Sequence, residues 1–404
     1  MARILVLNQY YSPDTTATAK YVSAIAERLA QEGHLVEAIV GQPSYSADAP
    51  DVPEREVTNG VAITRIALGR ARGRERMSRR LTGYLRFMAG AAVAAPRRRA
   101  DLVLCFHNPP PLILLGVLTA RLRGARVVYV PQDIHPDILL SSGFLQLPRA
   151  AVRSWDAMNR FVLKRSDRTI ALGDGMRETL VGKGAPPEQV ATIPLWAEPE
   201  LAVAPTDREY RAQLGLDTDL VVLYSGNMGV MHPLEPVLKA ARELQAEPVS
   251  FLFVGGGVRR ALWERKAAEL ELTNVTFMDF LPAEEFARLV AAADVGLVSL
   301  EPGMERLAVP SRGFAFLSAG LPVIAHMDPR ADVARIVQDG GAGWHAWTVE
   351  ELTALFRRLQ ADPAEVARAG GRARELFEQR FTRAAVTSRY AEVVSGLCGA
   401  RDAA

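Results

Sequence analysis

Short hydrophobic runs alternate along the chain with longer stretches whose apolar residues recur at helical spacing. Residues 3–8 form the first hydrophobic run, a polar loop follows, and residues 21–29 then carry the helical pattern up to Gly33. A second hydrophobic run, residues 36–40, comes directly afterwards. Strand, loop, helix and strand in this order are typical of a parallel α/β sheet.

Two series of this kind follow one another, separated by a proline-containing connector around residues 193–199. The first series predicts further strands at residues 62–66, 102–106, 126–130 and 169–172. The second predicts strands at residues 220–224, 249–254, 275–278, 295–300 and 323–325, with helices at 233–244, 259–270, 283–292 and 314–319. A last helical stretch, residues 381–397, lies beyond the second series.

We therefore predict an α/β protein with two Rossmann-like, doubly wound parallel-sheet domains. The predicted boundaries are residues 1–197 and 198–378 for the domains and 379–404 for a C-terminal helix that crosses back to the first domain. A length of 404 residues suits two domains of about 150–200 residues each. Because such sheets bind ligands beyond the carboxyl ends of their strands, we expect the active site in a cleft between the domains.

Composition excludes several classes of protein. Hydrophobic residues make up 49% and charged residues 23% of the chain, as in globular proteins. No stretch approaches the ~20 apolar residues of a membrane-spanning helix, and the N-terminus runs straight into a strand without the features of a signal peptide. Cys105 and Cys398 have neither metal-ligand nor disulfide spacing. We expect a cytoplasmic protein.

Arginines crowd one segment of a chain whose net charge is only +2. They are Arg65, Arg70, Arg72, Arg74, Arg76, Arg79, Arg80, Arg86, Arg97, Arg98 and Arg99. Leu81, Tyr84, Leu85 and Met88 lie among them at helical spacing, so we predict peripheral contact with the inner face of the cytoplasmic membrane through residues 70–99. The alternative is a helix packed on the sheet with a solvated basic edge. Because aromatic residues are not interleaved with the arginines, no nucleic-acid binding is expected.

The strand ends of the second series carry residues that suit phosphate binding. The predicted strand at 220–224 is followed by Gly226, Asn227 and Gly229, and a helix is predicted to begin at Pro233. Glycines let the backbone approach a ligand, and the free N–H groups of a helix start attract a diphosphate. An ordinary strand-to-helix turn, with glycines required only for its geometry, explains the same residues.

Neighbouring strand ends have the same character. Ser311 can cap a helix, and Arg312 would place a guanidinium beside an anion there, although a surface arginine paired with a carboxylate fits the same position. Together these strand ends favour a nucleotide. The residues assigned to its site are Gly226, Asn227, Gly229, Gly255, Gly256, Phe280, Leu281, Glu301, Pro310, Ser311 and Arg312.

Asp133 and His135 mark a second candidate site, because they follow the predicted strand at 126–130, where parallel sheets bind substrates. The alternative is a turn in which Asp133 caps backbone donors and Pro136 fixes the bend. The loop after the first strand, with Tyr11, Ser12, Thr15 and Thr18, is expected beside this site.

Motifs in both halves resemble a known family. The second half contains Tyr224-Ser225-Gly226-Asn227, Phe-Val-Gly-Gly-Gly at 253–257, Asn-Val-Thr-Phe at 274–277 with Phe-Leu-Pro at 280–282, Ala-Asp-Val-Gly-Leu-Val at 293–298 and Ser-Ala-Gly-Leu-Pro-Val-Ile at 318–324. These motifs resemble the carboxyl-terminal domain of retaining glycosyltransferases of family four, which have the GT-B fold. Residues 8–14 with Gly33-His34 resemble the subgroup that makes O-antigen, capsule and colanic-acid chains, N-acetylfucosamine transferases included.

The resemblance implies transfer of a sugar, with retention, from a nucleotide-diphosphate donor to a saccharide or polyprenyl-diphosphate-linked acceptor. UDP is the nucleotide expected from the subgroup, and the donor is a co-substrate, so no cofactor is implied. Asp133, His135 and Arg312 are the expected catalytic residues, and the loop with Tyr11, Ser12, Thr15 and Thr18 is expected to bind the acceptor. Because no Asp-any-Asp motif follows a predicted strand, arginines and helix N-termini are expected to stabilise the leaving diphosphate without a metal.

Two departures from the family pattern qualify this interpretation. The family's pair of glutamates, one of which holds the ribose, is replaced by Leu307 and Ala315. Its diphosphate-binding arginine and lysine are replaced by Asn227 and by a position near His232, which leaves Arg312 to supply the cation. A sugar-nucleotide 2-epimerase of the same fold and a non-catalytic partner in polysaccharide assembly are the alternatives.

Overall fold

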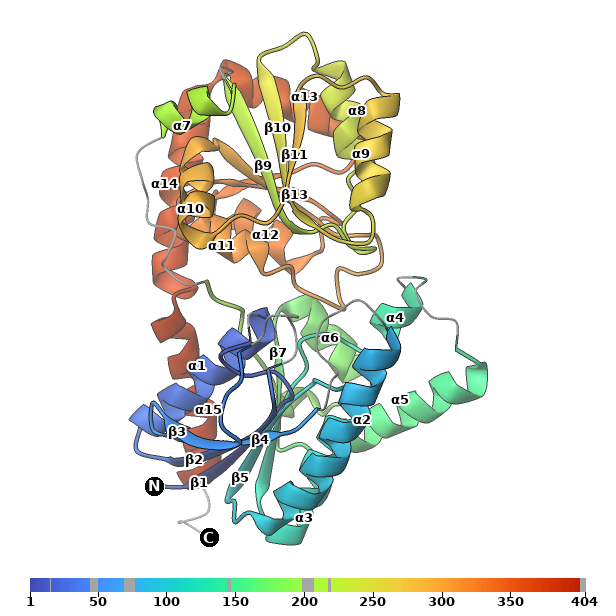
Figure 1. Cartoon of the computed structure of the whole chain (residues 1–404), viewed down its shortest axis with the longest axis vertical. Helices are drawn as coiled ribbons and strands as arrows, with labels where there is room; N and C mark the ends of the chain where they lie inside the picture. The colour runs from blue at the N-terminus through green and yellow to red at the C-terminus, as the bar shows by residue number, and fades with distance from the viewer. Residues whose placement is uncertain are drawn as a thin grey trace. The chain divides into compact units, whose positions relative to one another are not determined.

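The computed structural model describes residues 1–14, 16–43, 50–68, 77–141, 143, 147–197, 207–216 and 219–399. The chain divides into two compact units (Figure 1). The first comprises Met1–Pro136, Leu147–Ile193 and Val386–Ala404, and the second comprises Asp137–Gln146 and Pro194–Ala385. Within the described ranges, no helix has both the length and the apolar character needed to cross a membrane.

The first unit is built on a sheet that has eight strands in its described part, ordered β3-β4-β2-β1-β5-β6-β7-β8. All neighbours run parallel except β3, which pairs antiparallel with β4. The strands are β1 (Arg3–Leu7), β2 (Leu35–Gly41), β3 (Arg55–Thr58), β4 (Val61–Ile66), β5 (Leu102–Phe106), β6 (Arg126–Val130), β7 (Arg168–Ala171) and β8 (Val190–Thr192). The predicted parallel sheet is confirmed, whereas β3 and β8 were not predicted from the hydrophobic pattern.

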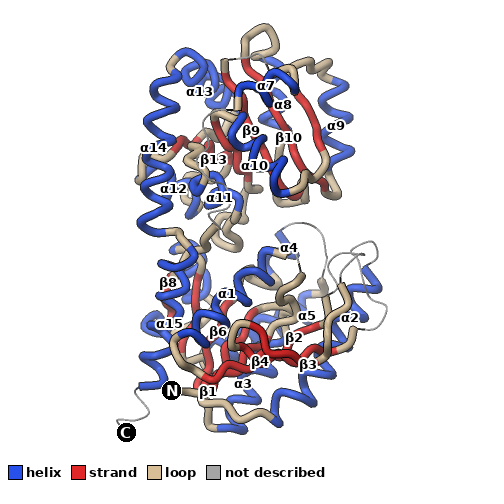
Figure 2. Tube along the Cα trace, turned by 60° about the vertical axis from the view of Figure 1, so that its left-hand side comes forward, coloured by secondary structure: helices blue, strands red, loops and turns tan. Residues whose placement is uncertain are grey.

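Helices flank this sheet (Figure 2). They are α1 (Ala17–Gln31), α2 (Met77–Ala94), α3 (Leu112–Arg123), α5 (Arg149–Leu163), α6 (Asp174–Gly182) and α15 (Arg383–Gly399), with short turns η1 (Ala95–Arg97) and η2 (Pro187–Gln189). Helix α1 begins where the Thr16 hydroxyl accepts the backbone N–H of Ala19 at 3.0 Å, and Gly33 just beyond its end has φ 84°. Its buried face, which includes Val22, Ile25 and Leu29, follows the helical spacing of the sequence.

The sheet of the second unit is parallel throughout its described part, in the order β11-β10-β9-β12-β13-β14. Its strands are β9 (Leu220–Asn227), β10 (Val249–Gly256), β11 (Val275–Met278), β12 (Val295–Ser299), β13 (Val323–His326) and β14 (Gly343–His345). The helices grouped with this unit are α4 (Asp137–Ser141), α7 (Arg208–Gln213), α8 (Glu235–Glu243), α9 (Arg260–Glu269), α10 (Ala283–Ala292), α11 (Arg312–Ser318), α12 (Asp332–Asp339), α13 (Val349–Ala361) and α14 (Pro363–Arg380).

The core of the second unit is rich in aromatic contacts. The ring of Phe251 on β10 packs edge-on against Phe356 of α13, with 5.1 Å between centroids, and Phe253 stacks on Phe277 of β11 at 5.2 Å. Each such side chain contributes about 1.5–3 kcal/mol when it is fully removed from water, so these contacts fix helices and strands to one another.

Three details differ from the sequence predictions. Strands β9 and β10 continue past the predicted ends at 224 and 254, through the glycine-containing residues up to Asn227 and Gly256. Helix α8 begins at Glu235, so Pro233 lies ahead of the helix and Pro236 occupies its first turn. Ser311 does precede α11, but its side chain makes no capping hydrogen bond.

Candidate functional site

The strand order of the second unit changes direction between β9 and β12, and open α/β sheets bind ligands outside the carboxyl ends at such a point. The loops that follow these two strands contact each other there. The backbone N–H of Glu301 donates to the carbonyl of Met231 at 2.8 Å, and Nδ1 of His232 lies 2.8 Å from the carbonyl oxygen of Ser299. These bonds make one surface from two loops that are far apart in the sequence.

The glycines at the end of β10 allow close packing of the backbone against the end of β9. Gly255 has φ 132°, and a Cβ there would lie 2.0 Å from the carbonyl oxygen of Gly226. A Cβ at Gly257 would lie 2.5 Å from the carbonyl oxygen of Met228. At these two positions the glycine is therefore explained by backbone geometry.

Gly226 is different, because it borders Arg312. A Cβ at Gly226, which has φ 137°, would meet only the Nε of Arg312, at 4.0 Å. Arg312 opens α11 and its guanidinium carbon lies 5.3 Å from the centroid of the Phe286 ring on α10. Burial raises the pKa of Tyr224 on β9, and the nearby Arg312 opposes that rise. The predicted arginine thus lies beside the predicted glycine loop.

Asn227 and Gly229 also lie together. The Nδ2 of Asn227 is 2.7 Å from where a Cβ of Gly229 would stand, so the amide lies across the turn that follows β9. An amide there offers both donors and an acceptor to a ligand.

Arg259 is a second cation at this edge of the sheet, which the sequence analysis missed. It follows β10 by way of Gly257, and its backbone N–H donates to the carbonyl of Met228 at 3.0 Å. Its guanidinium lies 3.6 Å from the carboxylate of Glu301. In the sequence Arg259 looks like the start of the charged helix α9. Its place shortly after a predicted strand could nevertheless have identified it as a candidate ligand-binding residue.

His232 does not replace the positive charge that the family's arginine and lysine provide. Burial lowers the pKa of His232 below its usual value, and the hydrogen bond to Ser299 only partly offsets this. The imidazole is therefore neutral at pH 7. Arg312, beside Gly226, and Arg259, beside Glu301, carry permanent positive charges at these strand ends.

The other predicted nucleotide-binding residues lie at neighbouring strand ends. Phe280 follows β11 and is 66% exposed, and one edge of its ring lies 3.4 Å from the position of a Cβ at Gly256. Leu281 follows it, half-buried, and Pro310 and Ser311 are half-buried ahead of α11. An exposed aromatic ring next to a glycine strand end offers a flat surface for a planar ligand group.

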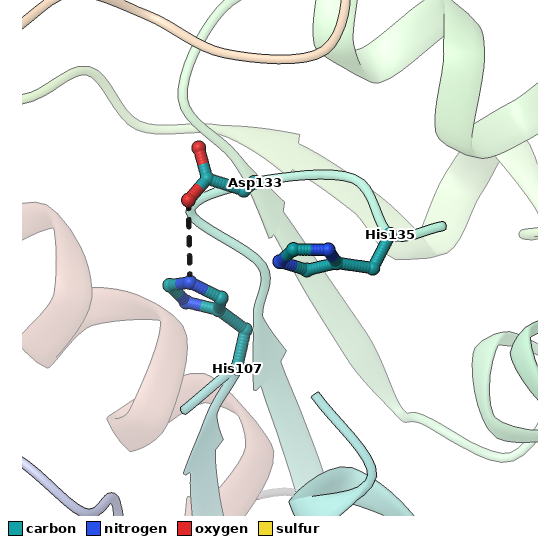
Figure 3. A group of neighbouring side chains, drawn as sticks. All are labelled: His107, Asp133 and His135. Carbon is teal, nitrogen blue, oxygen red and sulfur yellow. Dashed lines mark ion pairs between the residues drawn. The ribbon is translucent and has the colours of Figure 1, made fainter. Parts of the chain in front are cut away.

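The sheet of the first unit changes direction between β1 and β5. The loops after these strands are joined by the backbone N–H of Gln9, which donates to the carbonyl of Asn108 at 2.9 Å. Next to this point His107, after β5, lies beside Asp133 and His135, which follow β6 (Figure 3). The sequence analysis selected Asp133 and His135 but missed His107, which also stands directly after a predicted strand.

These three side chains form a compact polar group. Nε2 of His107 lies 3.5 Å from a carboxylate oxygen of Asp133, and the His107 and His135 rings stack with 6.0 Å between centroids. Desolvation raises the pKa of Asp133, but the hydrogen bond from His107 and the electrostatic attraction of the two histidines outweigh it, so the net pKa is lowered. Within the described residues, one potential ligand atom from each of the three lies within 4.8 Å of the others, a set with the donors that transition metals accept.

The predicted acceptor loop lies beside this group. The Thr18 hydroxyl donates to Oε1 of Gln132 at 2.5 Å, and Gln132 directly precedes Asp133. Tyr11 is buried in the first unit, which fits a role in holding the loop. The backbone N–H of Ser12 donates to the Ser23 hydroxyl at 2.9 Å and fixes the same loop. Thr15 lies outside the described residues.

The arginine-rich segment is only partly described. Arg65 is buried, pairs with Glu56 at 2.6 Å, and so is not part of a surface patch. Arg98 pairs with Glu37 at 3.3 Å. Arg70, Arg72, Arg74 and Arg76 lie outside the described residues, as do the side chains of Arg79 and Arg80.

Helix α2 packs through Phe87, which is fully buried, while Leu81 and Leu85 are 57% and 63% exposed. Tyr84 and Met88 are half-buried. Two residues of the predicted apolar stripe, Leu81 and Leu85, are therefore on the outer side of the helix, and the other two are partly covered.

Comparison with protein families matches both halves of the chain. Residues 16–196 match the glycosyl transferase 4-like domain, and residues 219–362 match glycosyl transferases group 1. The probable glycosyltransferase WbjE of Pseudomonas aeruginosa is 26% identical over 402 residues, 98% of each chain. The putative colanic acid biosynthesis glycosyl transferase WcaI of Escherichia coli K12 is 28% identical over 332 residues, covering 79% of this chain and 81% of the relative.

Solved structures share the fold. A sucrose-phosphate synthase from Thermosynechococcus elongatus matches with a TM-score of 0.76 and 18% identity over 99% of this chain and all of the other. The Anabaena protein HepE, in complex with UDP and glucose, matches with a TM-score of 0.72 and 16% identity over 98% of this chain and all of the other. Both comparisons support the same two-unit architecture.

Proposed function

We propose, from the premise that the chain is a glycosyltransferase of the GT-B fold, that it transfers a sugar from a UDP-sugar to a saccharide or polyprenyl-diphosphate-linked acceptor of a bacterial surface polysaccharide. The observation that carries the proposal is the position of Arg312 beside Gly226, with Arg259 beside Glu301, near the point where the second sheet changes direction. A relative named for colanic acid biosynthesis supports the polysaccharide, and structures of HepE with UDP and UDP-glucose support the donor.

The donor is held, in this proposal, by three parts of the second unit. Arg312 and Arg259 neutralise the diphosphate as it leaves, which arginine does well because its charge is permanent and its donors are fixed in one plane. Phe280 stacks on the base. Glu301 takes the ribose hydroxyls in place of the family's glutamates, because Ala315 carries no polar group and Leu307 is buried.

The proposed chemistry is the one that the family resemblance implies. As the anomeric carbon gains positive character, the two guanidinium groups stabilise the negative charge on the departing UDP, and no metal ion is required. The departing phosphate oxygen takes the acceptor proton on the same face, so the configuration is retained. Asp133 and His135 orient the acceptor from the first unit.

The decisive experiment offers the purified chain UDP-glucose or UDP-N-acetylglucosamine, with and without a synthetic polyprenyl-diphosphate-linked sugar. UDP is expected to be released in quantity only with acceptor, the new bond is expected to retain the donor's configuration by NMR, and most of the rate is expected to persist in EDTA. Acceptor-independent conversion to another UDP-sugar would identify an epimerase. Binding of UDP without turnover of any donor would identify a non-catalytic partner.

We also propose that α2 holds the enzyme at the inner face of the cytoplasmic membrane. Leu81 and Leu85 are exposed, and each would remove apolar surface from water on insertion. The arginines of residues 70–99 add about 1 kcal/mol each near an anionic surface, an attraction that salt screens over ~8–10 Å.

Replacing both Leu81 and Leu85 with Glu is expected to reduce binding to vesicles of phosphatidylglycerol and phosphatidylcholine by more than about tenfold. Val57→Glu, at a 75% exposed residue of β3, is the control for an added negative charge elsewhere on the surface and should change little. Co-sedimentation should also fall steeply as salt is raised. Equal binding to neutral vesicles, or none to either kind at low salt, would leave α2 as a helix with a solvated edge.

A further inference from the structure

The group formed by His107, Asp133 and His135 can be interpreted as a metal site or as a hydrogen-bonded chain (Figure 3). A backbone contact of His107 distinguishes between these two interpretations. The N–H of Gln132 donates to Nδ1 of His107 at 3.4 Å, and a backbone N–H can only donate. Nδ1 must therefore carry a lone pair, and the ring proton of a neutral His107 must be on Nε2.

A metal ion on Nε2 would reverse this arrangement. The ion would need the Nε2 lone pair, so the ring proton would move to Nδ1 and face the N–H of Gln132, donor against donor. With its proton on Nε2 instead, His107 donates to the Asp133 carboxylate 3.5 Å away. The contacts of His107 on both sides thus favour a chain of hydrogen bonds over metal ligation.

The exposure of the hydrogen-bonded side chains shows which of them a substrate can reach. His107 is only 3% exposed and stacks on His135, whose ring in turn stacks on Trp155 of α5 at 6.3 Å. The side chain of Asp133 is 38% exposed, and its second oxygen points away from His107 (Figure 3). The imidazole is therefore the fixed, buried support and the carboxylate is the accessible end.

We propose that His107 is a positioning residue: it holds one oxygen of Asp133 so that the other is aimed at the hydroxyl of the acceptor sugar. This inference rests on the proposed transferase function. A carboxylate held in one rotamer orients the attacking hydroxyl without an entropy cost at each turnover. The hydroxyl proton passes to the departing phosphate oxygen as the new glycosidic bond forms and the bond to UDP breaks, so Asp133 needs no change of protonation state.

Two substitutions separate the functions of the two ring nitrogens. In His107→Gln the amide N–H can stand where Nε2–H stands and still donate to Asp133. In His107→Asn the side chain can accept the Gln132 N–H but is too short to reach Asp133. We expect His107→Asn to lower kcat by about tenfold to a hundredfold, the value of a hydrogen bond to a charged group, with KM of the donor changed less than about twofold. His107→Gln should recover most of the loss.

A double variant gives the control for coupling. Because His107 acts through Asp133, the double variant with His107→Asn and Asp133→Asn should have nearly the same kcat as Asp133→Asn alone. The proposal would be overturned if the two substitutions lowered kcat by independent factors. It would also be overturned if His107→Gln and His107→Asn lowered kcat equally.

Ring-nitrogen NMR of the ¹⁵N-histidine-labelled full chain tests the hydrogen bonds without any assay of transfer, with His107 assigned by its disappearance in His107→Asn. We expect a proton on Nε2, none on Nδ1, and no change on adding one equivalent of Zn²⁺. A proton on Nδ1 would overturn the proposed hydrogen bonds, and a stoichiometric shift with Zn²⁺ would make the group a metal site instead. If no sugar transfer is found while the tautomer is as expected, the proposed function fails and the hydrogen-bonded arrangement stands.

Discussion

Arg312→Ala is expected to lower kcat/KM by about a hundredfold to a thousandfold, the usual cost of removing one preorganised donor that stabilises developing negative charge. The reason is its position beside Gly226 at the start of α11, where the diphosphate is proposed to leave. Arg312→Lys should lower kcat/KM less, because lysine keeps the positive charge but lacks the planar pair of donors. Steady-state kinetics with a saturating acceptor would measure both.

The control for Arg312 is another arginine of the second unit with an ordinary partner. Arg357 on α13 pairs with Glu247 at 2.8 Å and is half exposed, so Arg357→Ala should leave kcat/KM within about twofold of wild type, as expected of a surface ion pair. Melting temperatures of the variants would show whether the cation–π contact of Arg312 with Phe286 also contributes to the fold. Near-normal turnover of Arg312→Ala in a folded protein would remove Arg312 from the site.

Gly255→Ala is expected to destabilise the second unit by about 3–5 kcal/mol, at the upper end of single substitutions. The added Cβ would lie 2.0 Å from the carbonyl oxygen of Gly226, which belongs to a paired strand and cannot move aside, and φ at Gly255 is 132°. Thermal unfolding should show a fall in the melting temperature of roughly 6–20 °C for a unit of this size.

Gly371 provides the opposite case. It lies inside α14, and a Cβ there would meet no atom within 4 Å. Gly371→Ala should therefore raise the free energy of unfolding by about 1 kcal/mol, because alanine favours the helix. A Gly255→Ala protein as stable as wild type would mean that the ends of β9 and β10 can separate, contrary to the pairing described.

The sequence predicted the sheets well where strands are buried on both faces. Strands β5 and β6 were predicted to the residue, because a strand covered on both sides reads as an unbroken hydrophobic run. Strand β3 has mostly exposed residues, and β14 has only three residues, all half-buried, so neither leaves such a run. Short edge strands depend on pairing with a neighbour that the local pattern does not reveal.

The candidate site was predicted in outline, for a related reason. Single strand ends identified Asp133, His135 and Arg312 as candidates, but not which loops are neighbours. His107 became a candidate only once β5 was known to lie beside β6, and Arg259 only once its guanidinium was found near Glu301. The donor and acceptor nitrogens of His107 depend on a backbone N–H of another loop, which no residue pattern encodes.

The grouping of Val386–Ala404 with the first unit has a consequence for synthesis on the ribosome. Helix α15 buries Val386, Tyr390 and Val394, and Arg389 donates to the backbone carbonyl of Thr192 at 2.6 Å. The N-terminal unit therefore emerges early but lacks a helix of its own until the second unit has been translated. We therefore expect the emerging chain to expose the apolar surface that α15 covers for longer than a protein whose domains are completed one after the other.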